Sequence, residues 1–224
     1  MFGTHPLFGD YADAVHACGG HLARVVRNRD EPPRPAGDSF EDRLDRYHAW
    51  RLRQGVTRRV EVVALEDFRP AAGETYLFGF RGPQLRPLRN LLRQRFGLSF
   101  DPIVHPAASV SPMAVIGEGA FIGAGAVIAP HATVGEFTFV NRGATIGHDC
   151  EIGPCVIIGP SAAIASRVRL GDGAIVGIGA TVVENLAIGE GSCVAAGAVV
   201  LRDVPARVLV AGVPAVEKKP FFRA

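Results

Sequence analysis

Residues 115–128 read VIGEGAFIGAGAVI, and an isoleucine returns at every sixth position, at Ile116, Ile122 and Ile128. The same step of six continues in both directions without a slip, and every position it meets between residues 104 and 200 is aliphatic. The position four residues further on is mostly small, and glycine often follows the aliphatic residue directly. The aliphatic positions are Val104, Val110, Ile116, Ile122, Ile128, Val134, Val140, Ile146, Ile152, Ile158, Ile164, Leu170, Val176, Val182, Ile188, Val194 and Val200.

A period of six fits neither an α-helix nor a long half-buried strand, because their side-chain periods are 3.6 and 2. It predicts a solenoid in which each hexad supplies one very short strand and one bend, with glycine serving the corners. Three hexads make one triangular coil, and successive coils stack about one strand spacing, ~4.8 Å, apart. We therefore expect the aliphatic residues to form ladders in a narrow core and the small residues to fill its corners.

The composition places this repeat in a globular chain of 224 residues with a formal net charge of +2. No apolar run is long enough to cross a membrane, and the start of the chain lacks a secretory signal, so a cytoplasmic location is expected. The charge balance is not basic enough to indicate nucleic-acid binding. Cys18, Cys150, Cys155 and Cys193 form no CxxC pair, so neither a zinc cluster nor a disulfide framework is indicated.

The first 103 residues have a different, mixed α/β pattern and are rich in arginine. Helices are predicted over residues 10–18, over 40–53 after a Ser39–Asp42 start signal, and from Pro83 or Gln84 to Arg95. Strands are predicted over 22–26 and, as buried parallel strands, over 60–65 and 76–80, with a proline-rich loop over 30–38. The predicted domains are a small α/β substrate-binding domain (1–103), the solenoid (104–205) and a C-terminal tail (206–224) that covers the last coil.

The repeat resembles that of the hexapeptide-repeat acyltransferases. Its segment Gly147-His148-Asp149-Cys150, with Asn141 seven residues earlier, resembles the motif around the catalytic base of the sialic acid O-acetyltransferase and bacillosamine or perosamine N-acetyltransferase group. This resemblance implies a left-handed parallel β-helix after a Rossmann-like βαβ domain. It also implies a homotrimer whose active sites lie between subunits and use acetyl-CoA, without a metal.

The same resemblance assigns roles to individual residues. His148 is the general base, Asp149 holds its tautomer and raises its basicity, and Asn141 orients the acceptor or the histidine. Acetyl-CoA contacts are implied at Ile157, which stands where close relatives have a histidine, and at Ile178 and Ala196. The turn of Gly3, Thr4 and His5 is implied as part of the sugar site, although its glycine pattern departs from that of the group.

The frame of the repeat constrains this site further. Cys150 falls in the column of small corner residues, so we expect a packed neutral thiol, which is a poor nucleophile, and direct acetyl transfer. Residues 178 and 196 differ by one coil and should stack, whereas His148 and Ile178 differ by five hexads and should occupy different corners. One subunit then supplies the base and its neighbour the acetyl-CoA surface.

The resemblance implies an acetyl-CoA-dependent N-acetyltransferase that acts on an amino sugar, and a nucleotide-linked amino sugar is the expected acceptor. O-acetylation of a sugar of the sialic acid type, with the same base, is the first alternative. A non-catalytic trimeric scaffold or sugar-binding protein is the alternative from another class.

Overall fold

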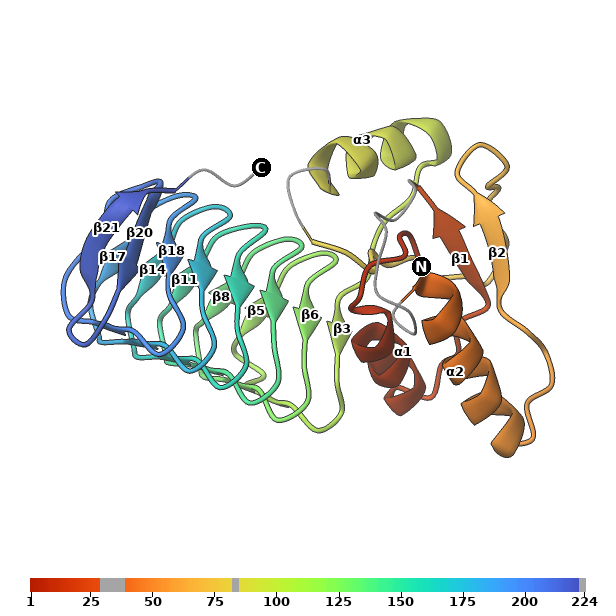
Figure 1. Ribbon diagram of the computed structural model, residues 1–224, viewed down its shortest axis with the longest axis horizontal. Helices are drawn as coiled ribbons and strands as arrows, with labels where there is room; N and C mark the ends of the chain where they lie inside the picture. Colours follow the sequence, from red (N-terminus) through yellow and green to blue (C-terminus); the bar gives the residue numbers. More distant parts are fainter. Residues whose placement is uncertain (29–38, 82–84, 222–224) are drawn as a thin grey trace. The chain divides into compact units, whose positions relative to one another are not determined.

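The computed structural model describes residues 1–28, 39–81 and 85–221, and it forms two compact units, residues 1–100 and 101–224 (Figure 1). The predicted loop over 30–38, the predicted helix start at Pro83 or Gln84 and the end of the tail lie outside the described residues. Each unit is described by itself below.

The first unit combines three helices with a small parallel sheet. Its helices are α1 (Phe8–Ala17), α2 (Phe40–Arg53) and α3 (Leu85–Phe96), and its strands are β1 (Arg24–Arg27) and β2 (Glu61–Ala64). Strands β1 and β2 pair in parallel, and Phe2 forms parallel bridges to Val26 and to Phe78. The sheet therefore continues past β1 as single bridges.

Helix α2 begins where the sequence predicts. The Asp42 backbone N–H donates to the Ser39 hydroxyl at 3.0 Å, and the Ser39 backbone N–H donates to the Asp42 carboxylate at 3.0 Å. This reciprocal capping box satisfies two N–H groups that have no partner within the helix. The predicted span of 40–53 is confirmed.

Two expectations for the first unit are wrong in detail. Strand β2 is largely exposed, with Val62 at 39%, because within the described residues it pairs only with β1 and forms the edge of the sheet. Residues 76–80 form isolated bridges at Tyr76 and Phe78 in place of a continuous strand. The buried apolar character here comes instead from aromatic packing, such as the stacked Phe78 and Phe100 rings at 4.4 Å.

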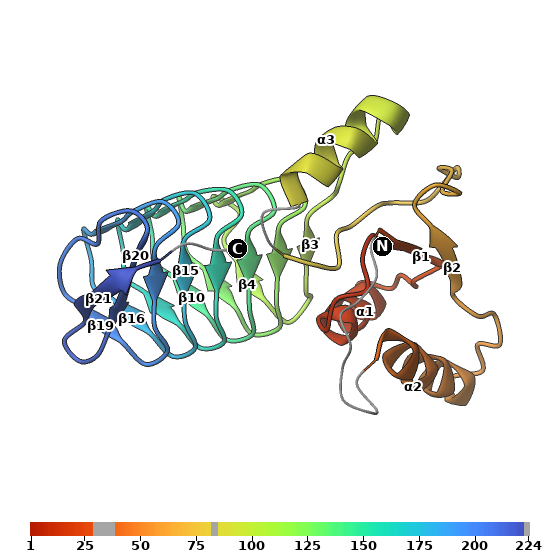
Figure 2. The same cartoon turned by 45° about the horizontal axis from the view of Figure 1, so that its top comes forward.

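The second unit is a solenoid of short parallel strands (Figures 1 and 2). All seventeen predicted aliphatic positions are the second residues of the two-residue strands β3–β19. These strands are β3 (Ile103–Val104), β4 (Ser109–Val110), β5 (Val115–Ile116), β6 (Phe121–Ile122), β7 (Val127–Ile128), β8 (Thr133–Val134), β9 (Phe139–Val140), β10 (Thr145–Ile146), β11 (Glu151–Ile152), β12 (Ile157–Ile158), β13 (Ala163–Ile164), β14 (Arg169–Leu170), β15 (Ile175–Val176), β16 (Thr181–Val182), β17 (Ala187–Ile188), β18 (Cys193–Val194) and β19 (Val199–Val200).

The strands form three sheets, one for each side of the triangular coil. Sheet I has the order β21-β20-β18-β15-β12-β9-β6-β3, in which β20 spans Val208–Ala211 and β21 spans Val216–Pro220. Sheet II has the order β19-β16-β13-β10-β7-β4, and sheet III the order β17-β14-β11-β8-β5. Each of the strands β3–β16 pairs in register with the strand 18 residues later, as Ile146 does with Ile164. The predicted three-sided coil is confirmed, and its corners are named below by the two sheets that they join.

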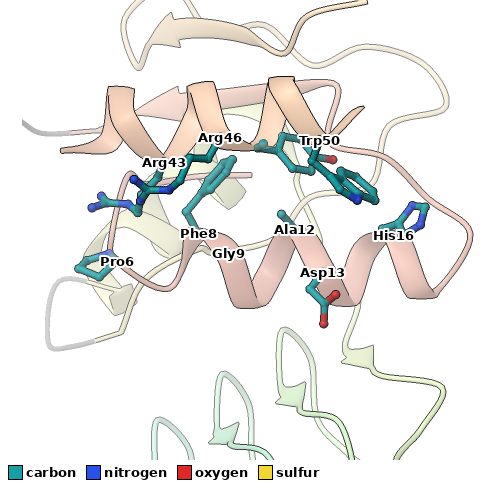
Figure 3. Close-up of a pocket in the computed structure, with 10 residues that line it drawn as sticks. Pro6, Phe8, Gly9, Ala12, Asp13, His16, Arg43, Arg46 and Trp50 are labelled. Atoms are coloured by element: carbon teal, nitrogen blue, oxygen red, sulfur yellow. The ribbon is translucent and has the colours of Figure 1, made fainter. Parts of the chain in front are cut away.

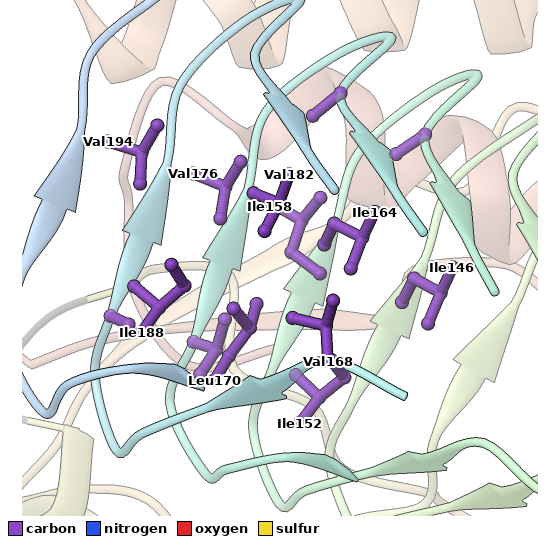
Figure 4. Close-up of a cluster of buried hydrophobic side chains, with 14 of the residues drawn as sticks. Ile146, Ile152, Ile158, Ile164, Val168, Leu170, Val176, Val182, Ile188 and Val194 are labelled. Atoms are coloured by element: carbon purple, nitrogen blue, oxygen red, sulfur yellow. The ribbon is translucent and has the colours of Figure 1, made fainter. Parts of the chain in front are cut away.

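The aliphatic ladders and the small corner residues form one continuous core (Figure 4). Ile158, Val176 and Val194 stack along sheet I with no exposed surface. Full burial of one such side chain contributes about 1.5–3 kcal/mol. The core thus gains its stability from repetition, since each coil buries the same set of side chains as the next.

The glycines of the repeat have two separate roles. The sequence predicts that the glycine directly after the aliphatic residue serves the bend. At Gly147, however, glycine is needed because the next coil packs closely against it. A Cβ added there would lie 2.6 Å from the backbone nitrogen of Ser166 in the next coil. Left-handed backbone occurs two residues further on, as at Gly125 with φ of 69°. Glycine therefore allows coils to stack at one position and the chain to turn at the other.

The tail extends and closes sheet I. Strand β20 (Val208–Ala211) pairs in parallel with β18, and β21 (Val216–Pro220) folds back antiparallel on β20. Val208, Val210 and Ala215 join the hydrophobic core. These apolar residues cover one side of the last coil.

Candidate active site

The segment around His148 forms one II–III corner of the solenoid. Ile146 at the end of β10 and Cys150 before β11 point into the core, so the two residues between Gly147 and Cys150 lie on the outside of the turn. Asp149 takes the left-handed conformation with φ of 58°. Its backbone N–H donates to the Pro130 carbonyl, and the Arg167 N–H donates to the His148 carbonyl at 2.9 Å. The corner is thereby fixed to the coils on both sides.

His148 and Asp149 form a contact pair on this surface. The His148 Nδ1 lies 2.7 Å from the Asp149 Oδ2, and the two side chains are 48% and 51% exposed. The hydrogen bond with His148 lowers the pKa of the Asp149 carboxyl, and the charges of His148, His131 and Arg167 act in the same direction. Since an ionised carboxylate only accepts hydrogen bonds, Nδ1 is the donor and the neutral ring keeps its lone pair at Nε2.

Cys150 is excluded as a nucleophile by its surroundings. Its side chain has no exposed surface, and its thiol donates to the Ala165 carbonyl with a sulfur–oxygen distance of 3.1 Å. Burial raises the pKa of the Cys150 thiol. The prediction of a packed neutral thiol in the small-residue column is confirmed.

Asn141 lies at a different corner from His148. It follows β9 at a I–II corner, and its side-chain oxygen accepts a hydrogen bond from the Arg142 backbone N–H at 2.7 Å. Strand β10 separates it from the His148 corner. The structure therefore places Asn141 one corner before the pair that it is expected to assist.

The three residues assigned to acetyl-CoA lie on two kinds of surface. Ile178 is 60% exposed and Ala196 is also exposed, both at I–II corners. The Gly197 N–H donates to the Ile178 carbonyl at 2.8 Å, so residues 178 and 196 stack as their spacing predicts. Ile157, the first residue of β12, is only 8% exposed and pairs with Phe139 and Ile175 in sheet I.

The N-terminal turn presents little side chain to solvent. Gly3 has a φ of 100°, and an added Cβ would clash with the Phe80 ring. Thr4 is 6% exposed, and its carbonyl accepts a hydrogen bond from the Arg43 guanidinium at 2.8 Å. His5 is partly exposed, and its Nδ1 accepts the Leu7 N–H at 3.3 Å. Of the three predicted residues, His5 alone offers a partly accessible side chain.

A groove between α1 and α2 contains residues that sequence reasoning did not assign to a site (Figure 3). Its volume is about 400 Å³. Arg43 and Arg46 lie beside Pro6 at the end where both helices begin, and His16 and Trp50 lie at the other end (Figure 3). Tyr47 and Trp50 stack at 5.7 Å, and the His16 ring meets the edge of Trp50 at 4.7 Å. The groove thus joins a cationic end to an aromatic wall.

The described residues form neither a metal-binding group nor a membrane-spanning helix. Within residues 1–28, 39–81 and 85–221, no three His, Cys, Asp or Glu side chains are grouped so that they could hold a metal ion. None of the helices in those ranges combines the length and apolar character that a bilayer span requires.

The repeat matches a known family. The model of the bacterial transferase hexapeptide (six repeats) matches residues 113–147 and 131–166, which include the His148 corner. A search of curated proteins gives no match.

Several solved structures are similar to this chain over most of its length. A mutant of perosamine N-acetyltransferase from Caulobacter crescentus, in complex with CoA and GDP-perosamine, is 29% identical with a TM-score of 0.76, and the match covers 97% of this chain and 95% of that one. The acetyltransferase domain of PglB from Neisseria gonorrhoeae, in complex with acetyl coenzyme A, is 24% identical with a TM-score of 0.76 and 97% of both chains covered. WeeI from Acinetobacter baumannii is 23% identical with a TM-score of 0.68, covering 87% of this chain and 85% of that one. The last two support the fold alone.

The comparisons confirm the predicted resemblance to hexapeptide-repeat acyltransferases of the nucleotide-sugar acetyltransferase group, and with it the prediction of an acyltransferase.

Proposed function

We propose that this hexapeptide-repeat acyltransferase transfers an acetyl group from acetyl-CoA to the amino group of a nucleotide-linked amino sugar, with His148 as general base. The observation that carries the proposal is the pairing of His148 Nδ1 with the Asp149 carboxylate at 2.7 Å on an exposed corner. A core position would explain neither the histidine nor the carboxylate, because both side chains are about half exposed. The pair instead leaves Nε2 accessible and able to take a proton.

The chemistry follows from this orientation. Acetyl-CoA supplies the acetyl group as an activated thioester. His148 Nε2 accepts a proton from the acceptor nitrogen as the new C–N bond forms and the C–S bond breaks, and it returns that proton to the departing sulfur. Asp149 stabilises the imidazolium during this interval. Cys150 takes no part, because its buried thiol cannot reach the surface of the corner.

The I–II corners support the proposed acetyl-CoA surface. Around Ile178 and Ala196 the chain reads Gly177-Ile178-Gly179 and Ala195-Ala196-Gly197, so small residues surround one exposed apolar side chain. A thin pantetheine arm fits such a strip, since the exposed Ile178 side chain offers it an apolar contact and the residues around Ile178 are small. Ile157 lies on a side of the coil and is nearly buried, so we assign it backbone or apolar edge contact at most.

The same geometry supports a homotrimer with shared sites. His148 occupies a II–III corner and Ile178 a I–II corner, so one solenoid presents the base and the acetyl-CoA strip on different edges. Three prisms packed around a common axis bring a II–III edge of one subunit to a I–II edge of the next. We propose this arrangement for the active site.

The first unit is proposed to bind the nucleotide part of the acceptor as a Rossmann-like domain. Its parallel β1–β2 pair continues through Phe2, and the turn of Gly3, Thr4 and His5 follows directly. Arg43 ties that turn to the α1–α2 groove through the Thr4 carbonyl, and Arg46 adds a second cation there. The relative that binds GDP-perosamine supports an acceptor of this class.

The test is acetyl transfer by the purified full chain with a panel of nucleotide-linked sugars. CoA release and a product gaining one acetyl group are expected only with acceptors that carry a free amine. Acetylation of hydroxyl sugars in their place would show an O-acetyltransferase. No turnover, together with sugar binding in a thermal-shift assay, would show the scaffold or binding protein and refute the proposal.

A further inference from the structure

Helix α2 reverses the usual distribution of side chains where it borders the α1–α2 groove. Its Arg43 and Arg51 are buried, with 8% and 5% of their surface exposed. Its Tyr47 and Trp50 are only partly buried, and both line the groove. Buried charged groups and accessible aromatic rings are the informative exceptions to ordinary packing. A role of the two rings at the groove accounts for this arrangement, whereas a role in the core does not.

The helical spacing of α2 arranges cations and rings in one line along the groove. Arg46 and Tyr47 lie three and four residues after Arg43, and Trp50 follows after one more turn, so the four residues share one face of the helix. The helix advances about 10 Å from Arg43 to Trp50, at ~1.5 Å per residue. Figure 3 shows the two arginines at one end of this line and Trp50 at the other. A ligand that lies along the groove therefore meets positive charge at one end and an aromatic wall at the other.

Helix α1 leaves room for such a ligand. It contributes the small residues Gly9 and Ala12 to the lining, and a Cβ added at Gly9 would meet no atom within 4 Å. The groove volume of about 400 Å³ lies within the range of small-molecule sites. Asp13 also belongs to the lining, but its carboxylate points away from the arginines (Figure 3). The cationic end is therefore suited to an anionic group.

We propose that the α1–α2 groove binds the nucleoside diphosphate part of the acceptor, with the diphosphate at Arg43 and Arg46 and the base against Trp50. The inference rests on the proposed function, which supplies the nucleotide-linked acceptor. Arginine pairs with phosphate oxygens through charge-assisted hydrogen bonds. Every base can stack on an aromatic ring, so this contact discriminates little between bases. The groove therefore accepts purine and pyrimidine nucleotides alike, and the hydrogen bond from Arg43 to the Thr4 carbonyl joins it to the N-terminal turn.

The experiment is a fluorescence titration of the full chain. Trp50 is the only tryptophan of the chain, so its emission reports directly on the groove. The probes are GDP, UDP, guanosine and inorganic pyrophosphate. GDP and UDP are expected to quench the emission saturably with similar Kd values, because both combine a base with a diphosphate. Guanosine and pyrophosphate are each expected to bind at least roughly tenfold more weakly than GDP, since each lacks one of the two contacts.

Two pairs of variants locate the binding. Arg46→Gln is expected to weaken GDP binding roughly tenfold, whereas Arg53→Gln removes the same charge from the exposed end of α2, outside the groove lining, and should leave the Kd unchanged. Gly9→Leu fills the open space and should abolish the quenching, whereas Gly9→Ala adds only a Cβ that meets no neighbour and should preserve it. If Gly9→Leu fails to fold, the arginine pair still decides.

Three results would overturn the inference. The first is that GDP causes no saturable change in Trp50 emission. The second is that Arg53→Gln weakens GDP binding as much as Arg46→Gln does, which would mean a general charge effect. The third is that pyrophosphate binds as tightly as GDP, which would remove the base from the groove.

Failure of this inference is distinguishable from failure of the proposed function. The titration measures binding and needs no turnover, whereas the proposed function is tested by acetyl transfer. Acetylation of a nucleotide-linked amino sugar, without any GDP-dependent change in Trp50 emission, would remove the groove as the nucleotide site and keep the function. GDP binding that depends on Arg46, without acetyl transfer to any nucleotide-linked sugar, would remove the function and keep the groove as a nucleotide site.

Discussion

At the scale of single residues, the site depends on one turn that exposes two polar side chains between two buried ones. Ile146 and Cys150 occupy the core, so the chain between them must point His148 and Asp149 outward. This placement could be predicted from the sequence, because the hexad frame assigns each residue to the core or the surface. The contacts of the Arg167 guanidinium with Asn185 and Glu184 could not, since they depend on the side-chain rotamers.

Asp149→Asn tests the carboxylate. The amide can still occupy the space, but it lacks the charge that stabilises the imidazolium and can turn its NH₂ toward Nδ1, which places the ring proton on Nε2. We expect kcat/KM for acetyl transfer to fall roughly tenfold to a hundredfold. Asp172→Asn, at a III–I corner, is the control and should keep the wild-type rate. An unimpaired Asp149→Asn enzyme would contradict the assigned role.

The Asp149 carboxyl stays ionised at neutral and mildly acidic pH. Because its pKa is lowered in the folded chain, the charge persists as pH falls to the ordinary carboxyl range and is lost only below it. We therefore expect protonation of Asp149 to play no part in the pH dependence of wild-type activity between neutral pH and the ordinary carboxyl range. A loss of the Nδ1 hydrogen-bond signal in NMR above pH 5 would contradict this.

At the scale of elements, the repeat was predictable to the residue and the first unit was not. Every coil makes the same contacts, so seventeen independent occurrences reinforce one frame, and all became strands β3–β19. In the first unit, β2 is exposed although its sequence is apolar, because its position at the sheet edge is a tertiary property. The α1–α2 groove likewise arises only when residues 6–16 and 43–50 are brought together.

The two roles of the glycines, close packing and turning, predict that substitutions at Gly171 and Gly173 differ in their effect on thermal stability. In Gly171→Ala the new Cβ would lie 2.5 Å from the Glu190 backbone nitrogen, so adjacent coils must separate. In Gly173→Asn the added Cβ meets nothing within 4 Å, and asparagine tolerates the φ of 65°. We expect Gly171→Ala to lower the melting temperature clearly and Gly173→Asn only slightly. Equal losses in thermal unfolding would contradict the packing role of Gly171.

At the scale of the whole molecule, the proposed active site combines His148 of one chain with the acetyl-CoA strip around Ile178 of another. The separation of His148 and Ile178 on different edges follows from the 18-residue coil, and the structure agrees with it. The sequence could therefore predict that one solenoid presents His148 and Ile178 on different edges. It could not predict the acceptor, because the residues proposed to contact it belong to turns and a groove of the irregular first unit.

Mixed oligomers test the shared site. His148→Ala and Ile178→Glu chains should each be inactive alone, but when coexpressed they should regain part of the wild-type rate, because some interfaces combine two intact edges. Coexpression of His148→Ala with Asp149→Asn is the control and should regain no more than the rate of Asp149→Asn itself, since both changes affect the same edge. If coexpressed His148→Ala and Ile178→Glu chains stay inactive although mixed trimers form, the active site is not shared between neighbouring chains.

The most direct test of the central claim is the rate of acetyl transfer by His148→Ala with an accepted amino-sugar substrate. Loss of the general base should reduce kcat/KM by about 10²–10⁴-fold. The melting temperature should stay within a few degrees of wild type, because the side chain lies outside the core. A well-folded His148→Ala enzyme that retains the wild-type rate would contradict the account.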